Sequence, residues 1–490
     1  MKQLLISAML ILSLSSTGLA QTQEDITKQA IVKIYTVSKV FNYQAPWSST
    51  MRSSTGSGAI IEGGYILTNA HVVANQTFLE VQRYGQRKRY IAEVYAVSHQ
   101  ADLALLKVKE ESFLKGVEPL TFGDLPEVEQ KIVVYGYPMG GSTLSATIGV
   151  VSRIEHHTYA HSGEVFLAVQ VDAAVNPGNS GGPALTNGKI VGVVMQVISK
   201  SQNIGYLVPS SMVKHFIKDM MDGRYDGFAD LGLITQKLEN PTLRRYYGVD
   251  DNVSGKLVDK VVHNSSLNGV LEEGDILTAV DGRNIEDDGT VAFRDHEYTD
   301  YHYFVDTYQM GDKVKLDILR DGKSMQIDAE LKYTADDMYL VKTTRYDKMP
   351  SYFVYGGYIF APLTRNLIRS TGRNRAALSY LASRWQTKDK AEVVVLLKVL
   401  ASDMSRGNNE FGMWPIQKIN DETFADFKEF HQKMKDAKDK YIVLEDEDGL
   451  KVVIDKEEAK KKQAEILIKY NIEYDKSIDL RSEELEGSVK

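Results

Sequence analysis

The sequence has no cysteine among its 490 residues. A disulfide framework is therefore excluded, and so is any site built on thiolates, such as a cysteine zinc site. The folded chain must instead gain its stability from hydrophobic cores and from assembly, for which a hydrophobic content of 43% is ample. The lack of cysteine does not identify a cellular compartment.

An excess of positive charge is also lacking, since 58 Lys and Arg face 66 Asp and Glu for a net charge of −8. A nucleic-acid-binding protein would show a basic field or stripe, so no nucleic-acid partner is expected. The segment Gly140-Gly141-Ser142 lacks the lysine and the following helix of a phosphate-binding loop and predicts a turn. No cofactor is expected.

Three histidines lie close together in a polar segment, namely His156, His157 and His161. They have no carboxylate or cysteine partner at a spacing typical of metal ligands. We therefore predict no metal site.

Long hydrophobic runs are confined to the N-terminus. A short basic start is followed by an apolar run from Leu4 to Leu14 and by small residues up to Ala20. This order is typical of a secretory signal peptide, and a membrane anchor is disfavoured because a spanning helix needs about 20 apolar residues. We expect cleavage after Ala20 and export, most simply to a bacterial periplasm or otherwise by secretion. No membrane-spanning segment is expected in the mature chain.

The segment DAAVNPGNSGGP, residues 172–183, places Ser180 among glycines that free the backbone around it. A serine nucleophile needs an exposed hydroxyl and backbone amides directed at the developing oxyanion. Ser180 is thus the candidate nucleophile, with the amides of Gly178 and Ser180 as the oxyanion hole. Taken alone, the segment is also compatible with an ordinary turn between strands.

A serine nucleophile requires a base and an acid that orients the base. His71 follows the apolar run Tyr65 to Leu67, and Asp102 precedes the apolar run Leu103 to Val108. Each residue alone could be a solvated loop histidine or an aspartate at a strand end. The order His, Asp, Ser is the one used by two-barrel serine proteases.

The motifs TNAHVV, ADLALLKV and DAAVNPGNSGGPAL, followed by IVGVV and IGYLVPS, resemble the HtrA/Deg family of serine proteases. The resemblance is greatest to the plant-type Deg proteases, which carry two PDZ domains. It implies that His71, Asp102 and Ser180 form the catalytic triad and that Gly178 and Ser180 supply the oxyanion donors.

The length of the chain predicts about three domains, at one per roughly 150 residues. Short β-rich runs from Gly56 to Pro209 indicate an antiparallel barrel or sandwich, and the resemblance implies two six-stranded barrels. The expected fold is mainly β, a two-barrel chymotrypsin-like protease domain followed by two PDZ-like α+β domains. The expected boundaries are a signal peptide at 1–20, a protease domain at 21–222, PDZ domains at 226–334 and 350–475, and a tail at 476–490. The polar stretch from Tyr43 to Thr55 is expected to be a loop.

Leu231, Gly232 and Leu233 resemble the carboxylate-binding loop of a PDZ domain, which presents backbone amides to a peptide C-terminus. The run from Glu273 to Ile285 predicts a strand and an Asp-Gly hairpin of such a domain, although a generic hairpin is the alternative. The charged and aromatic segment from Asp287 to Phe304 is an addition to a minimal PDZ domain.

A second, divergent copy begins near Gly356-Gly357-Tyr358, which resembles another carboxylate-binding loop. Met413 follows Gly412 where the first copy has an acidic residue after its glycine. This copy is therefore compatible with two roles, peptide binding and a structural or assembly role.

The strand of Val194, Met195 and Gln196 is expected to line the pocket for the residue before the cleaved bond. No acid lies there, so small or medium apolar residues are favoured. The resemblance implies an endopeptidase of protein quality control that cleaves unfolded or misfolded polypeptides, and the signal peptide implies that it is exported. It also implies PDZ-mediated binding of peptide C-termini or extended segments and assembly as a homotrimer or a multiple of trimers. The rival hypothesis is a PDZ-bearing chaperone or scaffold with a silent protease domain.

Overall fold

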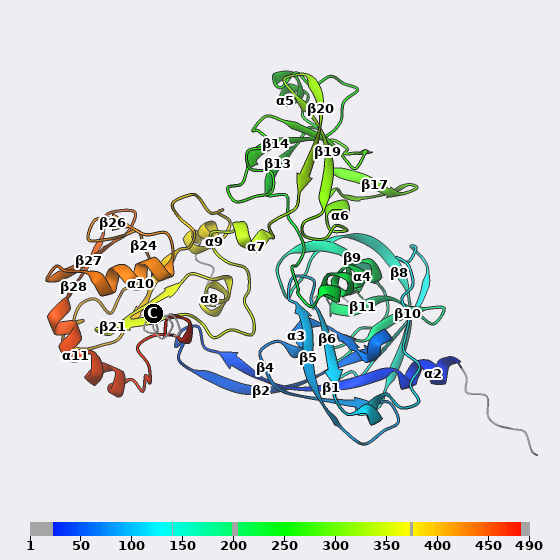
Figure 1. Ribbon diagram of the computed structural model, residues 1–490, viewed down its shortest axis with the longest axis horizontal. Helices are drawn as coiled ribbons and strands as arrows, with labels where there is room; N and C mark the ends of the chain where they lie inside the picture. Colours follow the sequence, from blue (N-terminus) through cyan, green and yellow to red (C-terminus); the bar gives the residue numbers. More distant parts are fainter. Residues whose placement is uncertain (1–22, 140, 198–203, 373–375, 482–490) are drawn as a thin grey trace, which may run out of the picture.

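The computed structural model describes residues 23–139, 141–197, 204–372 and 376–481, which form three lobes (Figure 1). One lobe holds two closed six-stranded barrels, and each of the other two is built around open antiparallel sheets with short helices. The expected fold class is confirmed. The domain boundaries remain predictions, as does the signal peptide, whose residues lie outside the described ranges.

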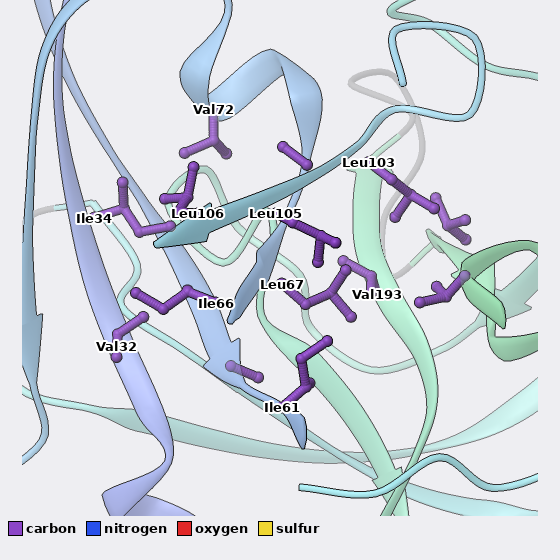
Figure 2. Close-up of a cluster of buried hydrophobic side chains, with 14 of the residues drawn as sticks. Val32, Ile34, Ile61, Ile66, Leu67, Val72, Leu103, Leu105, Leu106 and Val193 are labelled. Carbon is purple, nitrogen blue, oxygen red and sulfur yellow. The ribbon is translucent and has the colours of Figure 1, made fainter. Parts of the chain in front are cut away.

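The first barrel follows helix α2 (Gln23–Gln29) and has the strand order β1-β2-β3-β6-β5-β4. Its strands are β1 (Ile31–Phe41), β2 (Ser49–Ile60), β3 (Ile66–Thr68), β4 (Gln76–Arg83), β5 (Tyr90–Ser98) and β6 (Leu103–Val108). Branched aliphatic residues dominate its interior, as suits tightly packed strands. Val72 and Leu103 belong to this core (Figure 2) and are fully or nearly buried. They immediately follow His71 and Asp102, so burial of the core fixes both candidate catalytic residues.

The expected loop from Tyr43 to Thr55 is wrong over its second half. Strand β2 begins at Ser49 and pairs with β1 from Phe41 onward, with Val40 opposite Thr50. Apart from Met51 these residues are polar, and most are exposed, so no alternation of hydrophobicity predicts a strand, yet backbone pairing along β1 extends them. The resulting hairpin arm reaches the C-terminal lobe (Figure 1), where the rings of Trp47 and Tyr352 lie 5.9 Å apart.

The second barrel has the order β10-β11-β12-β9-β8-β7. Its strands are β7 (Lys131–Gly136), β8 (Ser145–Thr158), β9 (Val165–Val171), β10 (Pro183–Thr186), β11 (Lys189–Val197) and β12 (Gly205–Pro209). Helix α4 (Ser210–Asp219) follows and packs its apolar face, including Phe216, into a hydrophobic core to which both barrels contribute.

The second lobe contains a sheet in the order β13-β14-β15-β19-β20, with β16 paired to β15. Its elements are β13 (Leu233–Lys237), α5 (Pro241–Tyr246), β14 (Lys256–Val261), β15 (Ile276–Val280), β16 (Arg283–Asn284), β19 (Lys313–Arg320) and β20 (Lys323–Glu330). Asp281 and Gly282 join β15 to β16 with φ of +49° and +70°, the double left-handed geometry of an Asp-Gly hairpin. The added segment forms the hairpin β17 (Thr290–Arg294) and β18 (Glu297–Asp300) and helix α6 (His302–Val305).

The third lobe begins after helix α7 (Ala335–Met338) and contains two four-stranded sheets. The first is β21 (Phe353–Tyr355), β22 (Tyr358–Pro362), β23 (Val394–Val399) and β24 (Gly412–Ile416), and the second has the order β26 (Glu422–Thr423), β25 (Lys418–Ile419), β27 (Tyr441–Glu445) and β28 (Lys451–Asp455). Its helices are α8 (Arg365–Ser370), α9 (Ala376–Ala382), α10 (Phe427–Asp436) and α11 (Lys456–Lys469). Across the ranges that the structure describes, every helix is too short or too polar to cross a bilayer.

Candidate active site

His71 and Asp102 meet in the structure. His71 lies in the short helix α3 (Ala70–Val73), and its Nδ1 is 2.7 Å from Asp102 Oδ2. The backbone N–H of His71 also donates to Asp102 Oδ1 at 2.9 Å. The carboxylate thus holds both the ring and the main chain of His71, which leaves Nε2 as the atom available for proton transfer.

Asp102 is placed by a strained turn at the entrance of β6. Its φ is +54°, a left-handed conformation that few residues other than glycine adopt, and Asn69 Nδ2 donates to its carbonyl at 2.8 Å. Its side chain is only 1% exposed. Burial raises the pKa of Asp102, but His71 outweighs burial through its charge and hydrogen bond and holds the pKa below its usual range.

The same pair shifts the pKa of His71 in the opposite direction. Burial lowers the pKa of His71, whereas the Asp102 carboxylate raises it by charge attraction and hydrogen bonding. The carboxylate prevails, and the pKa of His71 lies above its usual value of 6.5. A histidine held in this way is suited to accept a proton at neutral pH.

The loop of Ser180 is fixed by contacts with the first barrel. Ser57, which is completely buried in β2, donates its Oγ to the carbonyl of Gly178 at 2.7 Å and its backbone N–H to the carbonyl of Ser180 at 2.9 Å. A Cβ on Gly181 would lie 2.2 Å from the Ser57 carbonyl oxygen, and one on Gly182 would lie 2.1 Å from the Tyr135 carbonyl oxygen. Glycine is therefore required at both positions after Ser180.

Two amides of this loop have no acceptor. Within the ranges that the structure describes, neither the Gly178 N–H nor the Ser180 N–H donates to any other group. Gly178 has a φ of +100°, and a Cβ there would lie 2.5 Å from the Tyr137 carbonyl oxygen. The pair of free donors beside a serine is the arrangement expected of an oxyanion hole.

Ser180 and His71 line one cleft of about 820 Å³, together with Gly178, Pro177 and Met139. Residues of strands β1 and β2 line this cleft, and so do Tyr346, just before the third lobe, and Asn366 within it. Among the described residues, Ser180 Oγ makes no hydrogen bond to His71. The structure therefore brings the three candidate catalytic residues to one place, with the bond between nucleophile and base still to form.

Two of the residues expected to bind substrate on β11 have buried side chains. Val194 is 0% exposed and Met195 is 3% exposed, and both belong to hydrophobic cores rather than to the cleft lining. Val194 exchanges two backbone hydrogen bonds of 2.9 Å with Gly181 and Gly182, so it supports the nucleophile loop. The side chain of Gln196 lies outside what the structure describes. A role for this strand in substrate binding remains a prediction.

The first of the two loops expected to bind a carboxylate lies at the start of the edge strand β13. Leu231 is buried, Leu233 is half-buried, and the Gly232 N–H donates to Asp230 Oδ1 at 2.6 Å. Gly232 has a φ of +66° and packs against Met338 of α7, which a Cβ would approach to 2.5 Å. Peptide binding at this loop remains a prediction.

The corresponding loop of the third lobe is filled from within the chain. Gln463 of α11 accepts a hydrogen bond from the Gly356 N–H at 2.7 Å and donates one to the Val354 carbonyl at 2.7 Å. A Cβ on Gly356 would lie 2.8 Å from that of Ala459. The side-chain amide of Gln463 thus occupies the Gly356 N–H, a donor that a bound peptide carboxylate would need.

The three grouped histidines separate in the structure. His156 Nδ1 is 2.8 Å from Thr299 Oγ1, His157 stacks on Tyr206, and His161 Nε2 is 2.9 Å from His99 Nδ1. The His161 ring centroid lies 6.1 Å from that of His71. Burial lowers the pKa of His161 to about 3, so it is neutral beside the catalytic pair.

Comparison with known proteins agrees with this arrangement. Residues 56–193 match the trypsin-like peptidase domain, and residues 341–479 match a PDZ domain. Protease Do-like 4, mitochondrial, of Arabidopsis thaliana is 37% identical over 81% of this chain and 74% of its own length. The chain belongs to the HtrA/Deg family of serine proteases. It is accordingly a serine endopeptidase, as the sequence predicts.

Two further comparisons extend this result. Protease Do-like 2, chloroplastic, also of Arabidopsis thaliana, is 36% identical over 92% of this chain and 75% of its own. A solved structure of the HtrA-type protease AlgW with tripeptide shares the fold at 24% identity and a TM-score of 0.50, covering 63% of this chain and 95% of AlgW.

The expected bacterial periplasm is contradicted by these relatives. They are named as mitochondrial or chloroplastic proteins and match this HtrA/Deg protease over most of its length. An apolar N-terminal segment does not distinguish destinations on its own, and the prediction of a periplasmic location is wrong.

Proposed function

We propose that this protease degrades unfolded or damaged polypeptides through a Ser-His-Asp mechanism, and that it does so within an organelle. One observation carries the mechanism. His71 is fixed to the buried Asp102 at 2.7 Å in the same cleft as Ser180, beside two backbone amides without acceptors.

In the proposed reaction Ser180 Oγ attacks the scissile carbonyl carbon, and its proton passes to His71 Nε2. The amides of Gly178 and Ser180 hold the oxyanion of the tetrahedral intermediate. As the C–N bond breaks, His71 returns the proton to the leaving amine, and an acyl-enzyme remains. Water then attacks the acyl carbon and passes a proton to His71, which returns that proton to Ser180 Oγ as the bond between Ser180 and the acyl carbon breaks and the carboxylic acid product leaves.

Substrate binding is proposed to involve the first PDZ domain as well as the cleft. Strand β13 lies at the edge of its sheet, where an extended peptide could add a strand. Peptide C-termini or extended segments of unfolded proteins are the proposed ligands, and small or medium apolar residues are the proposed preference before the cleaved bond. Assembly as a homotrimer or a multiple of trimers is proposed from the family.

The rival function is a chaperone or scaffold whose protease site is silent. Degradation of casein by the full chain and by Ser180→Ala separates the two. We expect cleavage by the wild type and none by the variant, together with fluorophosphonate labelling of Ser180 alone. Equal, negligible cleavage with undiminished suppression of aggregation would favour the chaperone, and labelling of another serine would refute the proposed nucleophile.

A further inference from the structure

The segment that leads into the third lobe forms part of the catalytic cleft. Tyr346 lines the cleft that contains His71 and Ser180, although it lies more than 160 residues away from Ser180 in the sequence. Its ring stacks on that of His161, with centroids 3.9 Å apart and an interplanar angle of 18°. Its hydroxyl donates to the His161 carbonyl at 2.8 Å. The ring is thereby held in one orientation.

Asp347, the next residue, is hydrogen-bonded to Asn75 and His99, which lie in the two segments that carry the catalytic pair, and we call these contacts the Asp347 clasp. The backbone N–H of Asn75 donates to Asp347 Oδ1 at 2.5 Å, and the backbone N–H of Asp347 donates to Asn75 Oδ1 at 2.6 Å. Asp347 Oδ2 is 2.8 Å from His99 Nε2. Asn75 lies four residues after His71, and His99 lies three residues before Asp102. The clasp therefore fixes Tyr346 relative to the catalytic residues.

The other side of the segment is anchored in the third lobe. Asn366 of α8 accepts a hydrogen bond from the Arg345 N–H at 2.7 Å and donates one to the Arg345 carbonyl at 2.9 Å. Asn366 itself lines the cleft. The residues on both sides of Tyr346, Arg345 and Asp347, are thus fixed by hydrogen bonds. A side chain held rigidly in this way can discriminate between substrates by their shape.

We propose that Tyr346 is a substrate-contacting, specificity-determining residue, and that the Asp347 clasp holds it in the cleft. A rigid ring on the cleft wall limits the size of the substrate side chain that fits beside it. The third lobe is then a structural part of the substrate-binding site. The inference rests on the proposed peptidase mechanism and names a further contact within it.

The test is cleavage of a library of short fluorogenic peptides, varied one position at a time, by the full chain. We expect Tyr346→Ala to change the preference at a single substrate position, raising kcat/KM for large side chains there about tenfold relative to alanine. Asp347→Ala should give the same change, because it releases the ring. Lys348→Ala, a substitution of an exposed neighbour, is the matched control and should keep the wild-type profile.

A second measurement does not depend on turnover. Benzoylphenylalanine placed at position 346 in the Ser180→Ala background should cross-link a bound peptide, and the same group at position 348 should not. Identical preference profiles for the wild type and Tyr346→Ala, or no cross-link at position 346, would overturn the inference. Failure of the proposed peptidase mechanism is distinguishable, because the wild type itself would then cleave no library peptide.

Discussion

The two lobes that follow the protease domain contact it in different ways. The second lobe docks on the second barrel through its β17 and β18 hairpin, and Arg294 of this hairpin donates to the carbonyls of Leu125 and Pro126, just before the barrel, at 2.8 Å each. The PDZ domain of residues 341–479 instead contacts the catalytic cleft through Tyr346 and Asp347. Among the described residues that line the cleft, none comes from residues 226–334.

This difference separates two kinds of coupling. A substitution at the first docking site changes how the second lobe binds the protease domain. We expect it to alter the rate of cleavage only for long substrates that contact both. A change at the second alters the cleft and affects even a short peptide. Cleavage of short peptides therefore discriminates between the two contacts, and the variants below test the comparison.

The largest effect is expected at the buried carboxylate of the catalytic pair. Asp102→Asn keeps the shape of the side chain but removes the charge that fixes the tautomer of His71, and kcat/KM for a short peptide should fall about 10⁴-fold. Asp347→Asn is the matched variant. Its carboxylate is 43% exposed and contacts His99 rather than His71, so the loss should stay below about tenfold. Similar losses for the two variants would refute the distinction between catalytic acid and clasp.

The pH dependence of kcat/KM should report His71. A protonated His71 cannot accept the serine proton, so activity should be lost as the pH falls through the pKa of His71. That pKa is raised by Asp102, so the midpoint of the acid limb should lie above 6.5. The neighbouring His161, with a pKa of about 3, should contribute no transition near neutral pH. A midpoint well below 6.5 would show that Asp102 does not stabilise the charged ring.

A smaller effect is expected at the first docking site. Arg294→Ala removes two charge-assisted hydrogen bonds, which weakens docking of the β17 and β18 hairpin by about 1–3 kcal/mol. Hydrogen exchange in that hairpin should increase, while kcat/KM for a short peptide stays within about twofold of the wild type. A large loss of short-peptide cleavage would contradict the separation of this domain from the cleft.

The smallest effect is expected at the filled loop of the third lobe. Gln463→Ala leaves the Gly356 N–H and the Val354 carbonyl without their partner, and the free energy of unfolding should fall by about 1 kcal/mol. Calorimetry measures this loss, and fluorescence anisotropy with C-terminal peptides should still detect no binding at this loop because Ala459 covers it. Tight binding by the variant would show that Gln463 alone keeps peptides out.

Much of the site could be predicted because its signals are local. The glycines around Ser180 are demanded by close approaches of 2.1 to 2.2 Å, and His71 and Asp102 adjoin buried aliphatic strands. The Asp-Gly hairpin at Asp281 likewise follows from backbone geometry that these two residues favour.

The remainder depends on contacts between distant segments. Ser57 stands out only as a polar residue between two glycines in a strand. The residues of the Ser180 loop to which it is hydrogen-bonded, Gly178 and Ser180, lie 121 and 123 positions further along the sequence, so no local pattern predicts these contacts. Nothing near Tyr346 in the sequence indicates a catalytic cleft, because its place there is set by the packing of a separate domain. The assignment of Val194 and Met195 to the substrate pocket followed their position in the strand; the sequence does not show that both side chains are buried in cores, and their contact with substrate remains a prediction.

The most direct test of the whole account is the identity of the residue that an active-site probe modifies. The full chain is treated with a fluorophosphonate at pH 8, digested and analysed by peptide mass spectrometry, in the wild type and in His71→Ala. We expect a single adduct on Ser180 in the wild type and its near-complete loss in the variant. An adduct on another serine, or labelling of Ser180 that is unaffected by the loss of His71, would contradict it.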